Sequence, residues 1–201
     1  MAHPAVGAGL LFCGNQGSVM ALYEFQNDAV SACANGFRTY DRVIAQLPTG
    51  GGKTNCAQEM IARARIKNNR VLFVVNRLEL VSQASRRFYQ AGIEHGMIQG
   101  NNTRNVGQNV LVASIQTLAK RGWPDVDFVI VDECHACAGS KAYQEMFMHY
   151  KGIKILGLTA TPWSKGLGKD YPGLGALFET VVKGPTYQRL IDDGFLVDVD
   201  V

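Results

Sequence analysis

The chain has 201 residues, of which 47% are apolar and 18% charged, and its formal net charge is +3. This length and apolar content are sufficient for one core, so we expect a single domain. The charges are too evenly balanced to indicate a dedicated nucleic-acid binder by themselves. Five cysteines without a repeating spacing argue against a disulfide framework and favour the cytoplasm, and no apolar run has the length of a membrane span.

From residue 25 onward, helical and strand-like patterns alternate along the chain. Helical spacing of apolar residues predicts helices at 26–35, 54–67, 78–90, 115–120, 141–150 and 187–191. Apolar runs predict strands at 42–47, 71–75, 110–113, 128–131, 154–158, 177–182 and 195–201. Residues 163–175 are expected to form a loop and residues 1–19 a flexible leader.

Buried strands that alternate with helices predict an α/β fold, in which a mostly parallel β-sheet is covered by helices on both faces. Ligands of such sheets bind at the carboxyl ends of the strands. Polar clusters follow five of the predicted strands: the Gly-rich turn at 48–52, Asn76-Arg77, Ser114, Asp132-Glu133 and Thr159-Ala-Thr161. We therefore expect the functional site at this edge of the sheet.

The Gly-rich turn belongs to the segment Leu47-Pro-Thr-Gly-Gly-Gly-Lys-Thr54, which joins a predicted strand to a predicted helix. This order places backbone N–H groups and a helix N-terminus around an anion. The three glycines permit close approach to phosphate oxygens, Lys53 brings a cation to the β- and γ-phosphates, and the Thr54 hydroxyl can bind magnesium. The pattern predicts a phosphate-binding loop; the alternative is a turn that only caps the helix.

A second segment, Val129-Ile-Val-Asp-Glu-Cys-His135, is an apolar strand that ends in two acids. Asp132 can hold magnesium, and Glu133 can orient or deprotonate an attacking water. Taken alone, such a pair could merely cap the next turn. Together with the Gly-rich turn, it predicts a site that hydrolyses a nucleoside triphosphate.

Cys134 and Cys137 form a C-x-x-C pair beside these acids. No second ligand pair with the spacing of a zinc site accompanies it, so we interpret the thiols as small apolar groups and expect no zinc. His135 lies between them; a lone histidine is more often structural than functional.

These segments, followed by Leu158-Thr-Ala-Thr-Pro162, resemble the motifs of superfamily 2 helicases of the DEAD/DEAH-box-like type. The resemblance runs from about Leu22 to the C-terminus and is to the branch with the helicase subunits of type I and type III restriction enzymes and phage DNA helicases. It implies a RecA-like P-loop NTPase fold that uses ATP and Mg²⁺. In this family Leu47 replaces an Ala or similar residue, so no first glycine is required.

The resemblance also implies roles for individual residues. Leu22–Gln26 resembles the adenine-reading segment, with Gln26 as the base-reading amide, although the family often has Arg-Pro at Tyr23-Glu24. The implied ATP-binding set is completed by Pro48, Thr49, Gly50, Gly51, Gly52, Lys53 and Thr54, and the implied catalytic set is Lys53, Asp132 and Glu133. His135, Thr159 and Thr161 correspond to groups that couple the nucleotide site to a second lobe.

Contacts to a nucleic-acid backbone are implied for Arg77, Ser114, Gln116 and Thr117. Such contacts suit a motor that must step along any sequence, because phosphates carry no sequence information. For Arg77 the alternative is a solvated residue at a helix start. Where relatives carry an Arg after Pro162, this chain has Trp163.

Helicases of this kind have a second lobe that supplies an arginine finger. The sequence has no second Gly-rich set, so we expect an ATP-binding lobe at 20–184, with 185–201 leading to a lobe that the chain lacks. The predicted function is that of a nucleic-acid-dependent ATPase, with DNA favoured over RNA and weak activity for this chain alone. The alternatives are a P-loop NTPase of another class and a non-enzymatic nucleotide- or nucleic-acid-binding module.

Overall fold

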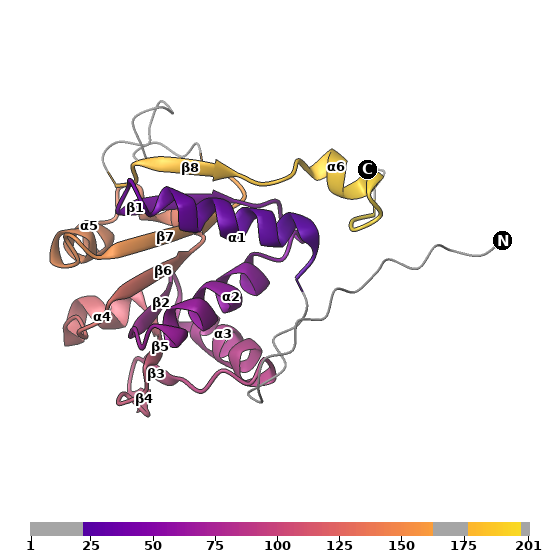
Figure 1. The fold of residues 1–201 in the computed structure, drawn as a ribbon. Coiled ribbons are helices and arrows are strands. Elements are labelled where there is room, and N and C mark those ends of the chain that lie inside the picture. Colours follow the sequence, from indigo (N-terminus) through magenta and orange to yellow (C-terminus); the bar gives the residue numbers. More distant parts are fainter. Residues whose placement is uncertain (1–21, 163–176, 198–201) are drawn as a thin grey trace.

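The computed structural model describes residues 22–162 and 177–197, which form one β-sheet with helices on both faces (Figure 1). The predictions of a leader at 1–19 and of a loop at 163–175 fall outside the described residues. None of the helices in the described ranges is long and apolar enough to cross a membrane.

The helices are α1 (Glu24–Gly36), α2 (Lys53–Ile66), α3 (Leu78–Gln90), α4 (Ile115–Arg121), α5 (Lys141–His149), α6 (Tyr187–Asp192) and the 3-10 helix η1 (Cys134–Cys137). The strands are β1 (Arg42–Gln46), β2 (Val71–Val75), β3 (Gly96–Gln99), β4 (Asn102–Arg104), β5 (Val110–Ser114), β6 (Phe128–Asp132), β7 (Lys154–Thr159) and β8 (Thr180–Lys183).

The eight strands lie in the order β4-β3-β5-β2-β6-β7-β1-β8. β4 pairs with β3 in antiparallel orientation, and every other neighbouring pair is parallel. The predicted α/β fold with a mostly parallel sheet is therefore confirmed. The order also places the carboxyl ends of β6, β7 and β1 side by side, although β1 is far from β6 and β7 in the sequence.

The core consists of two layers, one on each face of the sheet. Side chains of a strand alternate between faces, so Val43 and Ala45 of β1 enter one hydrophobic cluster and Ile44 enters the other. The first cluster includes the buried faces of α1, α2 and α3, and the second includes those of α4 and α5. Figure 1 shows these two groups of helices on opposite sides of the sheet. Burial on both faces explains why β2 and β5 are continuous apolar runs.

Three features differ from the sequence-based expectation. The hairpin of β3 and β4 was not predicted, because β4 is a polar edge strand with every residue exposed and has no alternating apolar pattern. β8 is shorter than the predicted strand at 177–182 and extends one residue beyond it. Residues 195–197 of the predicted last strand are not in a strand, and 198–201 lie outside the described residues.

Candidate nucleotide-binding site

The Gly-rich turn connects β1 to α2 and has the backbone of a phosphate-binding loop. Leu47 is fully buried and anchors the start of the turn in the core. Gly50 and Gly52 have φ angles of 82° and 79°, in the left-handed region that favours glycine. A Cβ at Gly52, the N-cap of α2, would overlap the Gln26 amide nitrogen. The turn therefore depends on glycine at this position for both its backbone conformation and its packing.

A cavity of about 590 Å³ lies beside this turn. Its lining includes residues predicted from the sequence, namely Thr49, Gly50, Gly52, Lys53, Thr54 and Glu133. It also includes Asn55, Gln58, Arg87, Gln90 and Ala91, which sequence reasoning missed. The missed residues lie on the helices α2 and α3 or directly after α3, and no local motif marks them.

Side chains from three neighbouring strand ends contact one another, and two of them, Lys53 and Glu133, line the cavity. Lys53 Nζ lies 3.2 Å from Glu133 Oε1, which joins the Gly-rich turn to the acid that follows β6. His135 Nδ1 lies 3.2 Å from Glu133 Oε2 and 3.0 Å from the hydroxyl of Thr159 at the end of β7. The Thr159 hydroxyl also accepts a hydrogen bond of 3.1 Å from the backbone N–H of Thr161. The predicted catalytic and coupling residues therefore form one connected network.

Glu133 has an unusual backbone conformation within this network. Its φ of 49° and ψ of 52° put a non-glycine residue in the left-handed region. That conformation costs about 1 kcal/mol or more and persists only where the surroundings impose it. Here β6 ends one residue earlier and η1 begins one residue later, so the turn between them directs the Glu133 side chain toward Lys53 and His135.

Asp132 is half-buried at the same strand end as Glu133. Burial and the neighbouring Glu133 carboxylate raise the pKa of Asp132, while Lys53, the Glu133 backbone N–H and Arg87 lower it to a smaller extent. A buried carboxylate beside a second carboxylate favours a nearby cation. The hydroxyl of Thr54 and the carboxylate of Asp132 are the hard oxygen donors that Mg²⁺ prefers. In the described ranges, no three His, Cys, Asp or Glu residues gather into a metal site, so these two would leave most coordination positions to phosphate and water.

The predicted adenine-reading amide is held by the protein itself. Gln26 is buried, donates from Nε2 to the Gly51 carbonyl over 3.3 Å and accepts from the Tyr23 backbone N–H over 3.2 Å. These bonds connect the start of α1 to the Gly-rich turn, and adenine reading by Gln26 stays a prediction.

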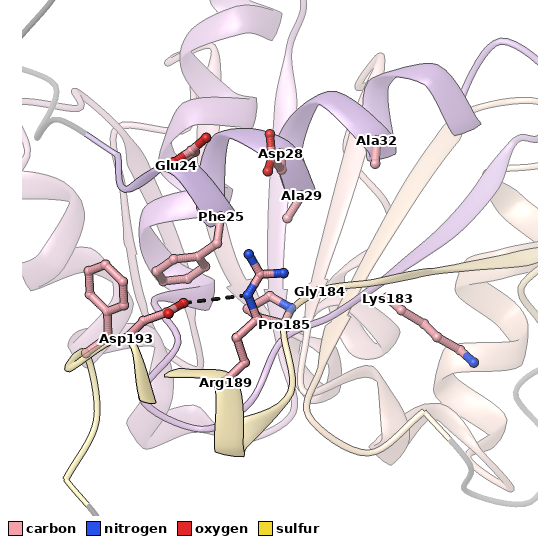
Figure 2. A pocket seen from close by; sticks show the side chains of 11 residues that line it. Glu24, Phe25, Asp28, Ala29, Ala32, Lys183, Gly184, Pro185, Arg189 and Asp193 are labelled. Carbon is pink, nitrogen blue, oxygen red and sulfur yellow. Dashed lines mark ion pairs between the residues drawn. The ribbon is translucent and has the colours of Figure 1, made fainter. Parts of the chain in front are cut away.

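A second cavity, of about 540 Å³, lies between α1 and the segment from β8 to α6. Figure 2 shows the Arg189 guanidinium directed from α6 toward α1, and Arg189 Nε lies 3.6 Å from Asp193 Oδ2. Phe195, which follows α6, packs edge-on against Tyr23 and Phe25 with ring centroids 4.6 and 5.1 Å apart. The segment after α6 therefore packs on the predicted adenine-reading segment.

The two thiols of the C-x-x-C pair belong to the hydrophobic core. Cys134 and Cys137 are both fully buried in the cluster on the α4 and α5 face. Burial raises the pKa of both thiols well above the ordinary value. They pack as small apolar groups, in agreement with the interpretation from the sequence.

The family model for the type III restriction enzyme res subunit matches residues 19–164 of the chain, which is well over half of it. The chain belongs to this family. The matched range contains the Gly-rich turn, both acids and Thr159-Ala-Thr161, so the family assignment and the geometric site coincide.

Relatives of the chain include proteins that are named as helicases. IRC3 of Saccharomyces cerevisiae is 27% identical over 202 residues, which covers 90% of this chain and 29% of IRC3. The ATP-dependent DNA helicase mph1 of Aspergillus fumigatus is 31% identical over 147 residues, which covers 62% of this chain and 13% of mph1. The chain therefore spans less than a third of the length of either relative.

A solved structure has the same fold. The type ISP restriction-modification enzyme LlaGI, as a nuclease-deletion mutant in complex with a DNA substrate mimic, superposes with a TM-score of 0.66 at 18% identity. The match covers 88% of this chain and 21% of LlaGI. Motifs, family and fold together identify the chain as an N-terminal, RecA-like ATP-binding lobe of the superfamily 2 helicase type.

The four predicted nucleic-acid contacts of this helicase lobe are placed differently from one another. Arg77 and Gln116 are exposed, and Gln116 donates from Nε2 to the Asn76 carbonyl. Ser114 and Thr117 are buried, their hydroxyls lie 2.8 Å apart, and the Ser114 hydroxyl caps α4 by accepting from the Thr117 backbone N–H. Direct contact with a nucleic acid is open to Arg77 and Gln116 in this conformation, whereas Ser114 and Thr117 serve the start of α4.

Proposed function

We propose that this chain is the ATP-binding lobe of a nucleic-acid-dependent ATPase, a helicase or translocase that acts on DNA in preference to RNA. The proposal rests mainly on the contact between Lys53 and Glu133, because it joins the phosphate-binding turn to the acid of a neighbouring strand end. A turn that only capped α2 would have no need of that acid. The names of the relatives include RNA helicases as well as a DNA helicase, so the preference for DNA rests on the enzyme of the same fold that was solved with a DNA substrate mimic.

In this proposal, the β- and γ-phosphates of ATP bind in the 590 Å³ cavity. Backbone N–H groups of the Gly-rich turn and the N-terminus of α2 bind the phosphate oxygens, and Lys53 neutralises part of their charge. To do so, Lys53 exchanges its contact with Glu133 for one with phosphate. Thr54 and Asp132 would hold Mg²⁺, which supplies further charge neutralisation at the phosphates when it is bound.

Once Lys53 has moved to the phosphates, the Glu133 carboxylate is free to orient a water molecule for attack on the γ-phosphate. His135 lies within hydrogen-bonding distance of both Glu133 and Thr159, so it can transmit a change at the nucleotide to the end of β7. The backbone N–H of Thr161 is hydrogen-bonded to the Thr159 hydroxyl, so a change at Thr159 can also reach Thr161. We propose that this chain of contacts couples hydrolysis to a second lobe, which completes the site with an arginine finger.

The decisive experiment is Glu133→Gln in the full-length parent protein. Gln keeps the size of the side chain but cannot accept a proton, so DNA-stimulated ATP turnover should fall by about a thousandfold or more, while ATP binding persists. Turnover is measured by phosphate release and binding by fluorescent-nucleotide titration. Glu145→Gln on α5 is the matched control, because among the described residues Glu145 forms its ion pair with Lys141 at the surface. Normal turnover in Glu133→Gln would refute the proposed role of Glu133.

The chain alone is expected to bind ATP or ADP weakly and to hydrolyse ATP slowly, without stimulation by DNA. Robust DNA-stimulated turnover by residues 1–201 would contradict the need for a second lobe. A comparison of single-stranded DNA and RNA as stimulators of the parent protein tests the preference for DNA.

A further inference from the structure

Arg87 is a charged residue of the nucleotide cavity that no motif identifies. It lies in the last turn of α3, and its side chain extends to the start of α2, where Nη1 donates to the Thr54 hydroxyl over 2.9 Å. Its backbone carbonyl accepts from Gln58 Nε2 of α2 over 3.3 Å. The first bond places the Arg87 guanidinium beside the phosphate-binding turn, and the second joins the backbone of α3 to α2.

Arg87 differs from the other charged residues of the cavity lining in its ion pairing. Lys53, Arg87 and Glu133 are the charged members of its lining, and Lys53 is already paired with Glu133. Within the described part of the chain, Arg87 forms no ion pair with a carboxylate, although its charge contributes to the field at Asp132. An arginine beside an anion-binding turn, without an acidic partner of its own, can form a charge-assisted bond with a phosphate.

The bond to Thr54 has a chemical consequence for magnesium. Arginine has only donors, so the Thr54 oxygen accepts in this bond, which occupies one of the two lone pairs of the hydroxyl. A guanidinium and Mg²⁺ also repel each other at such short range. Arg87 therefore has to leave Thr54 when Mg²⁺ binds there, and the phosphate oxygens in the adjoining cavity are the anions within its reach.

We propose that Arg87 is a second phosphate-binding cation, which holds the Thr54 hydroxyl in the empty site and pairs with a nucleotide phosphate once a nucleotide enters. The inference rests on the proposed function, since it requires a nucleotide in this cavity. It goes beyond the Gly-rich turn and the acids by assigning a specific role to α3, the helix that begins directly after Arg77.

The test is the affinity of residues 1–201 for a fluorescent ADP, measured in EDTA and in Mg²⁺, for the wild type, Arg87→Gln and Arg87→Lys. In EDTA, Arg87→Gln should bind roughly tenfold more weakly, as expected for one lost charge-assisted hydrogen bond. In Mg²⁺ the loss should be smaller, because the metal replaces the missing charge and takes the Thr54 hydroxyl without competition. Arg87→Lys keeps the charge and should recover most of the affinity in EDTA.

The matched control is Arg86→Gln. Arg86 is the preceding residue on α3 and is also exposed, but it lines a different cavity, with Ser85, Tyr89 and Arg104. Its substitution should leave ADP affinity unchanged in both buffers. Circular dichroism confirms that each variant is folded, as expected for changes at exposed side chains.

Lys53→Ala separates failure of this inference from failure of the proposed function. If Lys53→Ala loses ADP binding while Arg87→Gln binds as tightly in EDTA as Arg86→Gln, the proposed role of Arg87 is wrong and the nucleotide site stands. If the wild type binds no ADP, or Lys53→Ala binds it normally, both proposals fail.

Discussion

Two groups of polar residues lie at the carboxyl edge of the sheet, and the structure holds them in different ways. The nucleotide group, Lys53, Glu133, His135 and Thr159, is connected by direct contacts between side chains from three strand ends. In the predicted nucleic-acid group, Arg77 and Gln116 are exposed, whereas Ser114 and Thr117 are buried at the start of α4 and are hydrogen-bonded to each other.

This difference reflects what each group is proposed to bind. A phosphate in a cavity requires charges that are fixed before the ligand arrives, because organising them during the reaction would cost free energy. A nucleic-acid backbone on an open surface can be bound by exposed side chains that move with it. Side chains that contact one another in one group and exposed side chains in the other are therefore consistent with the proposed nucleic-acid-dependent ATPase.

The largest effect is expected when the nucleotide group loses its lysine. Lys53→Ala removes the cation of the Gly-rich turn and should weaken ADP affinity roughly 100-fold, as measured by fluorescent-nucleotide titration. Lys141→Ala is the control, because Lys141 is almost fully exposed and pairs weakly with Glu145 at 3.9 Å. Equal affinities in the two variants would show that the turn does not bind phosphate.

A smaller effect is expected at the nucleic-acid group. Arg77→Ala in the parent protein should weaken binding to single-stranded DNA roughly tenfold, with nucleotide affinity unchanged. The slope of the logarithm of the binding constant against the logarithm of the salt concentration should become less steep by about one. Binding is followed by fluorescence anisotropy at several salt concentrations. Arg65→Ala, an exposed arginine in the last turn of α2, serves as the control. An unchanged salt slope for Arg77→Ala would assign Arg77 to the solvated surface.

Ser114→Ala tests whether that hydroxyl caps α4 or contacts the nucleic acid. The lost cap should reduce the free energy of unfolding by about 1 kcal/mol, measured by urea denaturation, while DNA affinity of the folded protein persists. Thr186→Ala removes an equivalent cap, from the short helix α6, and should cost less because α6 is mostly exposed. Weaker DNA binding without a loss of stability would restore Ser114 as a contact.

The smallest effect concerns Asp132, the half-buried acid at the end of β6. Because the pKa of Asp132 is raised in the folded protein, its ionisation opposes folding: the cost is absent below the pKa of the unfolded chain and complete above that of the folded state. Asp132→Asn should therefore raise the Tm at pH 7, and this gain should disappear as the pH falls to about 4.

Asp28→Asn on the exposed face of α1 is the control for this measurement. A gain in Tm for Asp132→Asn that does not change with pH would show that packing, and not charge, is responsible. Asp132→Asn should at the same time weaken the Mg²⁺-dependent part of nucleotide binding. The ionised carboxylate would then lower the stability of the lobe but contribute to Mg²⁺ binding.

The helices and strands with strong local signals were predicted well from the sequence. α3 begins and ends at the predicted residues, Leu78 and Gln90, because its apolar residues recur with helical spacing. β2 was predicted from a run of five apolar residues, which burial on both faces requires. The hairpin of β3 and β4 was missed, since a polar edge strand gains its order from pairing with a neighbour and not from its own pattern.

Local sequence by itself determined the chemistry available to the site: three glycines before Lys53 and Thr54, and two acids at the end of an apolar strand. These are short-range patterns, and their physical requirements lie within a few residues. Only the tertiary structure decided which groups meet, because the strand order β6-β7-β1 is set by packing between distant segments. That order brings Glu133 to Lys53 and His135 to Thr159, and the packing of α3 beside α2 brings Arg87 to Thr54.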